Sequence, residues 1–591
     1  MLDIRRGLGV GEETAAVERS KRVGGSAAAR GWRLVGRSLD YLEADVGGAT
    51  ALVAAIAASV TLSLYLTRGT TFWFDEFALY SGNRGFDLTF LLTQHNGQLI
   101  LLPRLIYATI FELFGPNYLV VRMVEAVGVA LVGATVYALA RPRIGALALA
   151  PAILLMFFGY SWDSTLTGNG IINVYCLLPG LAALLVLDRR PRFAYPLACL
   201  LLASSLASWS AGLAFVAGAA VLLLQRGALR RGAWAFAIPL LLWSAWWIVR
   251  PGLSGPLYST DTNLKAVNVL LIPNFAASSL AATLAAITGL NFDFAQAPPT
   301  TNGPGFDTSW GPALAVMAII GLALVLRRRP VAVWPWPWLA VLATFWAATA
   351  LVSFVLRRPD AGRYVYVGAA ALVVLTAWAL APFRLTRRLA PLALAALVVA
   401  LAANIAHLRD ASAYLRTYAT SVRADLAAVE IARNRVSPGY VPVVGPLASP
   451  FLASAAQAGT YLPAVDRNGS FADTLPELRA APEGTRAEAD QVLGGALGLH
   501  LATTIPPAGS SGCRRLRPAS SGVTFEVPRG GARILSAGGS VIALRRFAAA
   551  YTVELGKARS RWSALRIPTD LAPDPWRAHV ATTLPVEVCP L

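Results

Sequence analysis

The chain has 591 residues, of which 56% are hydrophobic and only 14% charged, and its net charge is +19 at neutral pH. These proportions exclude an ordinary soluble globular protein, in which about a quarter of the residues are charged. The positive charge would suit a nucleic-acid-binding protein, but the arginines gather in short clusters between apolar segments, as in "LDRRPR" and "VLRRRP". Such clusters are typical of the cytoplasmic loops of membrane proteins, so we expect no nucleic-acid partner.

Residues 1–48 are polar and arginine-bearing, and we expect them to form a cytoplasmic N-terminal tail. After them, apolar stretches of about 20 residues recur, and an α-helix needs this length to cross a bilayer. They lie at 49–67, 119–140, 234–249, 311–326, 331–356, 364–382 and 389–406. We therefore predict an all-α polytopic domain at 49–408, with about 11–13 transmembrane helices in the cytoplasmic (inner) membrane.

Two segments leave the number of spans open. The segment 99–114 is short and carries Arg104, and the segment 274–290 is only weakly apolar. If every basic loop stays in the cytoplasm, both segments are peripheral and 250–310 forms one long outer loop. In this topology the loop after the first span lies outside the cytoplasm, and so does the chain after the last span.

The chain from 409 to 591 has a different pattern. Residues 409–435 continue the last apolar segment as a helix, and "VTFEV", "ARIL" and "SVIALRRF" indicate short strands between Gly and Pro residues. We predict a small extracytoplasmic domain here, either α/β or mostly β. Cys513 and Cys589 are its two cysteines. Because disulfides persist outside the cytoplasm, we expect these cysteines to form one.

The chain contains no phosphate-binding glycine loop, no zinc-ligand spacing and no nucleophile elbow. An enzyme built from it would therefore need an activated substrate and carboxylate chemistry. In "TFWFDEFALY", Asp75 and Glu76 lie between aromatic residues just after the first span. They are either a solvated loop start or a catalytic pair whose pKa values the apolar surroundings raise, which would make one a general base.

This acidic pair, the following "HNGQLILLPRLIYATIFELFG" and the later "GRYVYV" resemble motifs of the C-type (GT-C) glycosyltransferases. These are integral-membrane enzymes that use polyprenyl-phosphate-linked sugars. The resemblance covers 49–408 in architecture and implies a hexosyl or pentosyl transferase of the cell envelope. It implies Asp75 as the general base and Glu76 as a supporting carboxylate. The acceptor would be an envelope glycan, lipid or protein, with membrane lipids around the enzyme.

The resemblance implies further site residues. His95 and Asn96 would lie near the acceptor, although a structural turn remains the alternative. Arg363 and Tyr364 open a late span, and a guanidinium can hold two oxygens of a donor phosphate. Lipid-headgroup contact is the alternative for this arginine. Asp163, in "GYSWDSTLTGNG", matches the place of a second acidic residue.

The sequence leaves the cofactor open, and it leaves room for other functions. A divalent cation, Mg²⁺ or Mn²⁺, would be held by the carboxylates of Asp75, Glu76 and Asp163. The alternative function is a transporter or flippase of lipid-linked saccharides, for which intramembrane charges are typical. A non-catalytic scaffold that presents the C-terminal domain would leave the acidic pair without a role.

Overall fold

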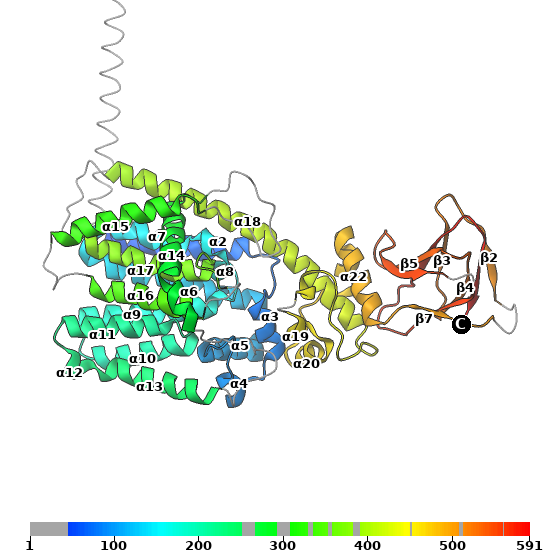
Figure 1. The fold of residues 1–591 in the computed structure, drawn as a ribbon, viewed down its shortest axis with the longest axis horizontal. Helices are drawn as coiled ribbons and strands as arrows, with labels where there is room; N and C mark the ends of the chain where they lie inside the picture. Colours follow the sequence, from blue (N-terminus) through cyan, green and yellow to red (C-terminus); the bar gives the residue numbers. More distant parts are fainter. Residues whose placement is uncertain are drawn as a thin grey trace, which may run out of the picture.

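The computed structural model describes residues 45–250, 266–291, 308–328, 335–352, 357–381, 390–449, 452–506, 512–558 and 561–591. Most of the described chain is helical, and its strands lie in the C-terminal part. Figure 1 shows a bundle of packed helices, one long helix that leaves it, and a β domain at the far end. The N-terminal tail predicted at 1–48 lies outside the described residues except for its last few positions.

The helical bundle carries the apolar segments of the sequence. Its main described helices are α2 (Asp45–Leu66), α6 (Tyr118–Ile144), α7 (Leu149–Met156), α9 (Gly170–Arg189), α10 (Ala194–Ser208), α11 (Gly212–Gln225), α13 (Trp234–Val249), α14 (Ile272–Thr288), α15 (Gly311–Arg327), α16 (Trp336–Leu351), α17 (Gly362–Leu380) and α18 (Ala390–Ile431). Six described helical stretches are long and apolar enough to cross a membrane, and five apolar helices are shorter. These features indicate a multi-pass membrane protein.

Helix α6 shows how the bundle meets its surroundings. Leu119, Met123, Val127 and Leu131 recur every fourth residue and are all exposed large apolar side chains. Residues at this spacing share one face of a helix. Since water would solvate such a stripe poorly, it is the face that lipid tails cover.

Ion pairs join two basic loops at one end of the bundle. At one end Arg143, at the end of α6, pairs with Asp188 of α9 at 2.7 Å. Arg226, just after α11, pairs with the other oxygen of Asp188. The first residues of α6 and α9 and the start of α3 (Asp75–Gly82) lie at the opposite end, where the Tyr118 hydroxyl donates to Glu76. The basic loops around Arg143 and Arg226 thus share one end, as the topology predicts, whereas Arg357 lies at the other end, where it binds the carbonyl of Asn96. The "FRLTRR" loop is outside the described residues.

Helix α14 corrects the prediction that 250–310 is one outer loop. The helix packs on α15, α16, α17 and α18, and Figure 1 shows it running across the neighbouring helices. Its sequence is weakly apolar because it is rich in Ala and Ser, and small residues let helices approach closely. Gly311 of α15, for example, packs so tightly on Ala281 that no side chain would fit there. The flanking residues 251–265 and 292–307 are outside the described part of the chain.

The segment 99–114 forms a helix, α5 (Leu101–Phe114), which is not among the described helices long and apolar enough to cross a membrane. This agrees with the peripheral placement. Arg104 of α5 donates to the carbonyls of Phe90 (2.8 Å), Leu91 (3.3 Å) and Thr93. These carbonyls end the short helix α4 (Leu88–Leu92), so a buried guanidinium caps it.

The last helix of the bundle continues without a break into the C-terminal region, as predicted. Helix α18 has 42 residues and crosses the proposed domain boundary at residue 409. Four short helices follow: α19 (Ala453–Ala456), α20 (Ala458–Asn468), α21 (Leu475–Ala480) and α22 (Glu483–Ala496). Helices α21 and α22 pack on α18, and Tyr461 of α20 donates to Glu430 of α18 at 2.6 Å. Because a continuous helix joins the two regions, no flexible linker separates them at this boundary.

The C-terminal β domain has two antiparallel sheets. One has the strand order β1-β7-β4-β9-β2 and the other β3-β8-β5-β6. The strands are β1 (Leu501–Thr503), β2 (Arg514–Leu516), β3 (Val523–Glu526), β4 (Gly530–Leu535), β5 (Val541–Arg545), β6 (Val553–Lys557), β7 (Ser563–Ile567), β8 (Arg577–Ala581) and β9 (Val586–Pro590). The three strands predicted from sequence appear as β3, β4 and β5. Inward side chains of both sheets, such as Phe525 and Ile534, belong to one apolar core.

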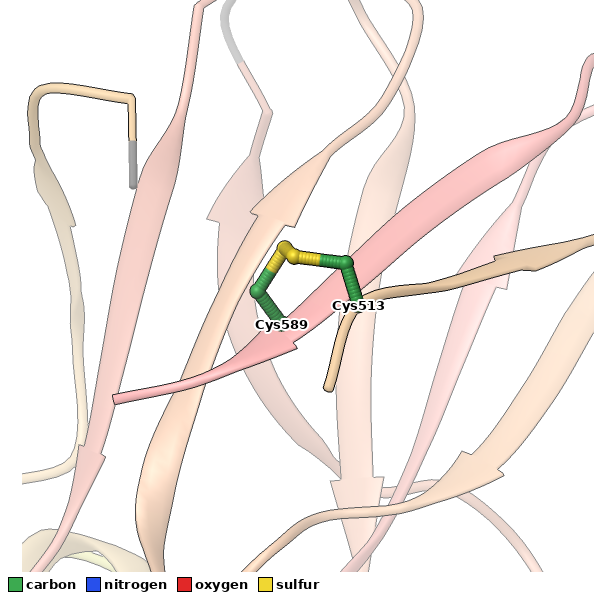
Figure 2. Close-up of a disulfide and its surroundings, with 2 residues drawn as sticks. All are labelled: Cys513 and Cys589. Atoms are coloured by element: carbon green, nitrogen blue, oxygen red, sulfur yellow. A yellow bond between two sulfur atoms is a disulfide. The ribbon is translucent and has the colours of Figure 1, made fainter. Parts of the chain in front are cut away.

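The predicted disulfide is present. Cys513, just before β2, and Cys589 of β9 are bonded, with their Cα atoms 4.1 Å apart (Figure 2). The bond closes a segment of 76 residues in sequence separation. It therefore ties the end of the chain to the beginning of the β domain, where terminal strands otherwise fray.

Two carboxyl groups meet where α22 packs on α18. Asp425 is fully buried, and a side-chain hydrogen bond joins it to Glu488, which also bonds to Ser421. Gly445, with φ +72°, lies against both carboxyl groups and leaves no space for a side chain. A hydrogen bond between two carboxyl groups requires that one keeps its proton. Burial raises the pKa of Glu488 above its ordinary value of 4.5, whereas the hydrogen bond from Asp425 lowers it, so Asp425 holds the shared proton and donates it to Glu488.

We expect Glu488→Gln to stabilise the protein at pH 8. When folding raises the pKa of a carboxyl group, the folded protein becomes less stable relative to the unfolded chain as the pH rises above the unfolded pKa of 4.5. The amide oxygen of glutamine can accept from Asp425, and glutamine stays uncharged at every pH, so the variant should melt a few degrees higher than wild type at pH 8, roughly 2–4 °C per kcal/mol. The difference should shrink toward pH 4.5. Melting temperatures of both proteins at the two pH values measure it.

Glu554→Gln, at an exposed position of β6, is the matched control and should leave the melting temperature unchanged at both pH values. An equal effect of Glu488→Gln at high and low pH would contradict the shared proton.

Candidate functional site

The site predicted from sequence lies at the end of the bundle where α3 begins. Helix α3 starts at Asp75, directly after Phe74, whose φ is +45°. Three non-glycine residues in the described chain have positive φ, and two of them, Phe74 and Asn96, adjoin Asp75 and His95. Such backbone strain persists only where surrounding contacts hold it, and it is common at functional sites.

Aromatic packing holds this segment in place. Phe72 is fully buried, and Trp73 packs edge-on against Trp162 with ring centroids 5.2 Å apart. Trp162 in turn packs against Tyr414 of α18 at 5.6 Å. The aromatic residues before the acidic pair therefore join the loop of Asp75 to the loop of Asp163.

Asp75 contacts the predicted His-Asn pair. Its Oδ1 lies 3.5 Å from Nε2 of His95, whose side chain is only 5% exposed, whereas that of Asp75 is 36% exposed. A side-chain hydrogen bond also joins Asp75 to Asn96. The structural turn that was the alternative is therefore present, since "HNGQ" is a tight turn, and this turn presents two polar side chains to Asp75. A place of these side chains near an acceptor stays a prediction.

The electrostatics of Asp75 differ from the expectation. Desolvation would raise the pKa of Asp75, but the hydrogen bond and charge of His95, with the charge of Arg363, lower it below the ordinary range. The prediction that the aromatic surroundings raise the pKa of both acidic residues is therefore wrong for Asp75. Its carboxylate is ionised at neutral pH because cationic and hydrogen-bonding partners outweigh the apolar collar.

Glu76 is the residue whose pKa is raised. It is fully buried, and burial raises its pKa to about 7. Its oxygens accept hydrogen bonds from the backbone of Trp73 (2.9 Å) and the hydroxyls of Tyr107 (3.2 Å) and Tyr118 (3.1 Å). Gly168 lies against the same carboxyl group and leaves it room. These contacts fix the side chain of Glu76 inside the protein, next to Asp75 in the sequence, and Glu76 has no access to solvent.

Asp163 and Arg363 meet at the start of α17. The backbone N–H of Arg363 donates to Oδ2 of Asp163 at 3.3 Å, so the carboxylate caps the N-terminus of this helix. Gly362 packs against Oδ1 of the same residue, where a larger residue would collide. The side chain of Arg363 attracts both Asp163 and Asp75 electrostatically. One guanidinium therefore lies under the influence of both predicted carboxylates.

Tyr364 has a packing role beside this arginine. It is 5% exposed and stacks on Trp209 with ring centroids 6.0 Å apart. A side-chain hydrogen bond joins it to Arg363, whose guanidinium carbon lies 5.1 Å from the tyrosine ring centre. Hydrogen bonding and cation–π attraction thus fix the direction of the Arg363 side chain.

The three predicted carboxylates do not form a metal site. Within the described chain, the one group of three or more potential ligands within 4.8 Å of one another is Cys513, Glu587 and Cys589, and its two sulfurs are joined in the disulfide. Asp75, Glu76 and Asp163 are therefore not within chelating distance of each other as a set. A cation at this site would need ligands from a substrate phosphate.

A buried ion pair that was not among the predicted site residues lies next to Glu76. Arg122 and Glu125 of α6 are 1% and 0% exposed, and their side chains meet at 2.8 Å. Arg122 also donates to Ser63 (3.0 Å) and to the carbonyl of Thr165 (3.2 Å). The signal was the spacing of two opposite charges by three residues inside an apolar stretch, which places them on one helix face.

The C-terminal region also reaches the site. The Tyr80 hydroxyl of α3 donates to the carbonyl of Gly469 at 2.5 Å, and Asn83 donates to Asn468 of α20 at 3.0 Å. Phe77 of α3 packs on Tyr461 of α20 at 6.0 Å between ring centroids. The helix that begins with Asp75 is therefore clamped between the bundle and the C-terminal region, a contact between distant segments that no local pattern indicates.

No protein-family model, curated protein or solved structure matches the chain. The functional argument therefore depends on the residues and their geometry, together with the motif resemblance.

Proposed function

We propose that the protein is a membrane glycosyltransferase that moves a sugar from a polyprenyl-phosphate donor to an extracytoplasmic acceptor. The observation that supports this most is the placement of an ionised, partly exposed Asp75 beside His95 and within reach of the charge of Arg363. A base and a phosphate-binding cation at one end of a membrane bundle are the two parts that this transfer needs.

In the proposed reaction, a hydroxyl of the acceptor attacks the anomeric carbon of the donor sugar. Its proton passes to the carboxylate of Asp75, and the bond between the anomeric carbon and the phosphate oxygen breaks. The electron pair of that bond leaves with the polyprenyl phosphate, whose charge Arg363 stabilises. Asp163 and Tyr364 orient the side chain of Arg363. Glu76 stabilises the first turn of α3 through its hydrogen bond from the backbone of Trp73.

The proposed topology places the protein in the cytoplasmic (inner) membrane, with the end that holds Arg143 and Arg226 in the cytoplasm. The six long and five shorter apolar helical stretches suit the range of about 11–13 spans in a GT-C-like architecture. The site and the C-terminal domain then lie outside the cytoplasm. The acceptor is an envelope glycan, lipid or protein.

A transporter or flippase of lipid-linked saccharides is the second candidate, and one observation favours it. Arg122 and Glu125 form a buried ion pair within an apolar helix, and ionisable groups at such positions are typical of transport pathways. The glycosyltransferase explains the partly exposed Asp75 better, because a flippase needs no base at its outer end.

Asp75→Asn should abolish sugar transfer while donor binding and folding stay near wild type. Asparagine keeps the size and hydrogen bonding of Asp75 but cannot take the proton, and general base catalysis is typically worth 10²–10⁴-fold. The measurement is transfer from labelled polyprenyl-phosphate sugar by the purified protein. Asp360→Asn, which removes the partner of the exposed Arg358, is the control and should retain activity. Turnover above about a tenth of wild type would rule out Asp75 as the base.

Arg363→Lys should weaken donor binding by roughly tenfold or more, because an ammonium loses the two-point grip on a phosphate. Binding of labelled donor to the protein in nanodiscs measures the affinity. The same substitution at Arg358, which is exposed and paired with Asp360 at 2.5 Å, should leave donor affinity unchanged. Equal affinities of Arg363→Lys and wild type would instead favour a lipid-headgroup role for Arg363.

A further inference from the structure

The turn that carries His95 has an unusual backbone. Asn96 has φ +50° and Gly97 has φ +74°, so both central residues are left-handed. The backbone N–H and carbonyl of His95 each bond to Gln98, at 2.9 and 2.8 Å. This is the tight geometry for which Asn-Gly is the preferred pair. It leaves the carbonyls of Asn96 and Gly97 available to partners outside the turn.

Two arginines from distant parts of the chain bind these carbonyls. Nη2 of Arg357 donates to the carbonyl of Asn96 at 2.9 Å, and Nη1 of Arg250 donates to that of Gly97 at 3.3 Å. Arg357 is 7% exposed. The guanidinium of Arg250 lies 3.2 Å above the ring centre of Trp247, which fixes its direction. Each central carbonyl of the turn therefore has its own guanidinium.

The residues before the turn are fixed as well. The indole N–H of Trp246 donates to the carbonyl of Leu92 at 2.8 Å, and Arg104 binds the neighbouring carbonyls. Because His95 Nε2 and Asp75 Oδ1 are already 3.5 Å apart, a small shift of the turn would break their contact. The position of this turn therefore determines whether His95 and Asn96 stay in contact with Asp75.

We propose that Arg357 and Arg250 are positioning residues that clamp the Asn96–Gly97 turn and thereby keep His95 and Asn96 on Asp75. Arg357 acts through this turn and not by binding the donor phosphate, although its place beside Arg363 in the sequence suggests an anion ligand. The proposal rests on the proposed function, in which Asp75 is the base. The clamp itself is a geometric claim that can be tested without sugar transfer.

The chain offers a matched pair for the test: Arg357 and its neighbour Arg358. The side chain of Arg358 is 71% exposed and paired with Asp360. Arg357→Gln and Arg358→Gln remove the same charge from adjacent positions, so they weaken long-range attraction of an anionic donor alike. The first readout is the rate at which diethyl pyrocarbonate modifies His95 in the full-length protein, resolved from the other histidines by peptide mass spectrometry.

We expect Arg357→Gln to raise the modification rate of His95 by about fivefold or more, because release of the turn exposes the imidazole that is 5% exposed in the clamped state. Arg358→Gln should leave the rate at the wild-type value. Arg250→Gln should also raise it, and this variant decides the matter if Arg357→Gln does not fold. An unchanged rate in the folded Arg357 or Arg250 variant overturns the proposal, whatever the activity.

The second readout is kinetic. In Arg357→Gln, kcat should fall by about tenfold or more while the donor KM stays within about threefold of wild type. The acidic limb of the pH–rate profile should move to higher pH, because Asp75 loses the turn partners that lower its pKa and also the direct attraction of the Arg357 charge. If Arg357 only stabilised the fold, the acidic limb would stay at its wild-type pH, and kcat would not fall selectively relative to the donor KM. A raised donor KM with unchanged kcat and His95 reactivity would make Arg357 a phosphate ligand and contradict the clamp.

The two readouts separate the proposals. If His95 becomes reactive in Arg357→Gln but the wild-type protein transfers no sugar, the clamp stands and the glycosyltransferase function fails. If transfer depends on Asp75 while His95 reactivity is unchanged in Arg357→Gln, the function stands and the clamp fails.

Discussion

The attraction of one guanidinium for two carboxylates organises the candidate site. Arg363 begins a helix of the bundle with its backbone N–H bound to Asp163, and its charge acts on both Asp163 and Asp75. For the partly exposed Asp75, this charge adds to the hydrogen bond and charge of His95 and outweighs desolvation, so the pKa of the carboxylate is lowered. Because α17 carries the arginine, α8 (Trp162–Thr165) carries Asp163 and α3 carries Asp75, this attraction links three elements that are far apart in the sequence.

The C-terminal region is part of the same assembly. Helix α18 leaves the bundle and passes into that region without a break, and α20 with the following residues packs on α3. Hydrogen bonds from Tyr80 and Asn83 and the contact of Phe77 with Tyr461 join the two. A substitution in α20 would therefore change the packing of α3, which begins with Asp75. The C-terminal region thus supports the candidate site in addition to forming the β domain.

Local sequence patterns predicted much of this fold. The strands β3, β4 and β5 follow from alternating or apolar runs between Gly and Pro, and the continuation of α18 follows from an unbroken helical pattern. The disulfide follows from the topology, which leaves Cys513 and Cys589 together on one side. The strands and the continued helix depend on properties that a short stretch of sequence carries by itself, whereas the disulfide depends on the order of apolar and basic segments along the whole chain.

Features that depend on contacts between distant residues were not predictable in this way. The weakly apolar sequence of helix α14 left its place open, and its small side chains allow the close helix contacts that place it in the bundle. The pKa of Asp75 is lowered because His95 and Arg363 approach it, which no neighbouring residue indicates. Similarly, the arginines on the Asn96–Gly97 turn come from positions 250 and 357.

One measurement tests the central claim most directly: the fate of the sugar. Purified protein in liposomes is given labelled polyprenyl-phosphate sugars, one hexosyl and one pentosyl, together with envelope glycan and lipid acceptors. The proposed glycosyltransferase should move the label to an acceptor and release polyprenyl phosphate in equal amount. If the label remains on the lipid and only crosses the bilayer, the protein is a flippase and the assignment of Asp75 as a base is wrong.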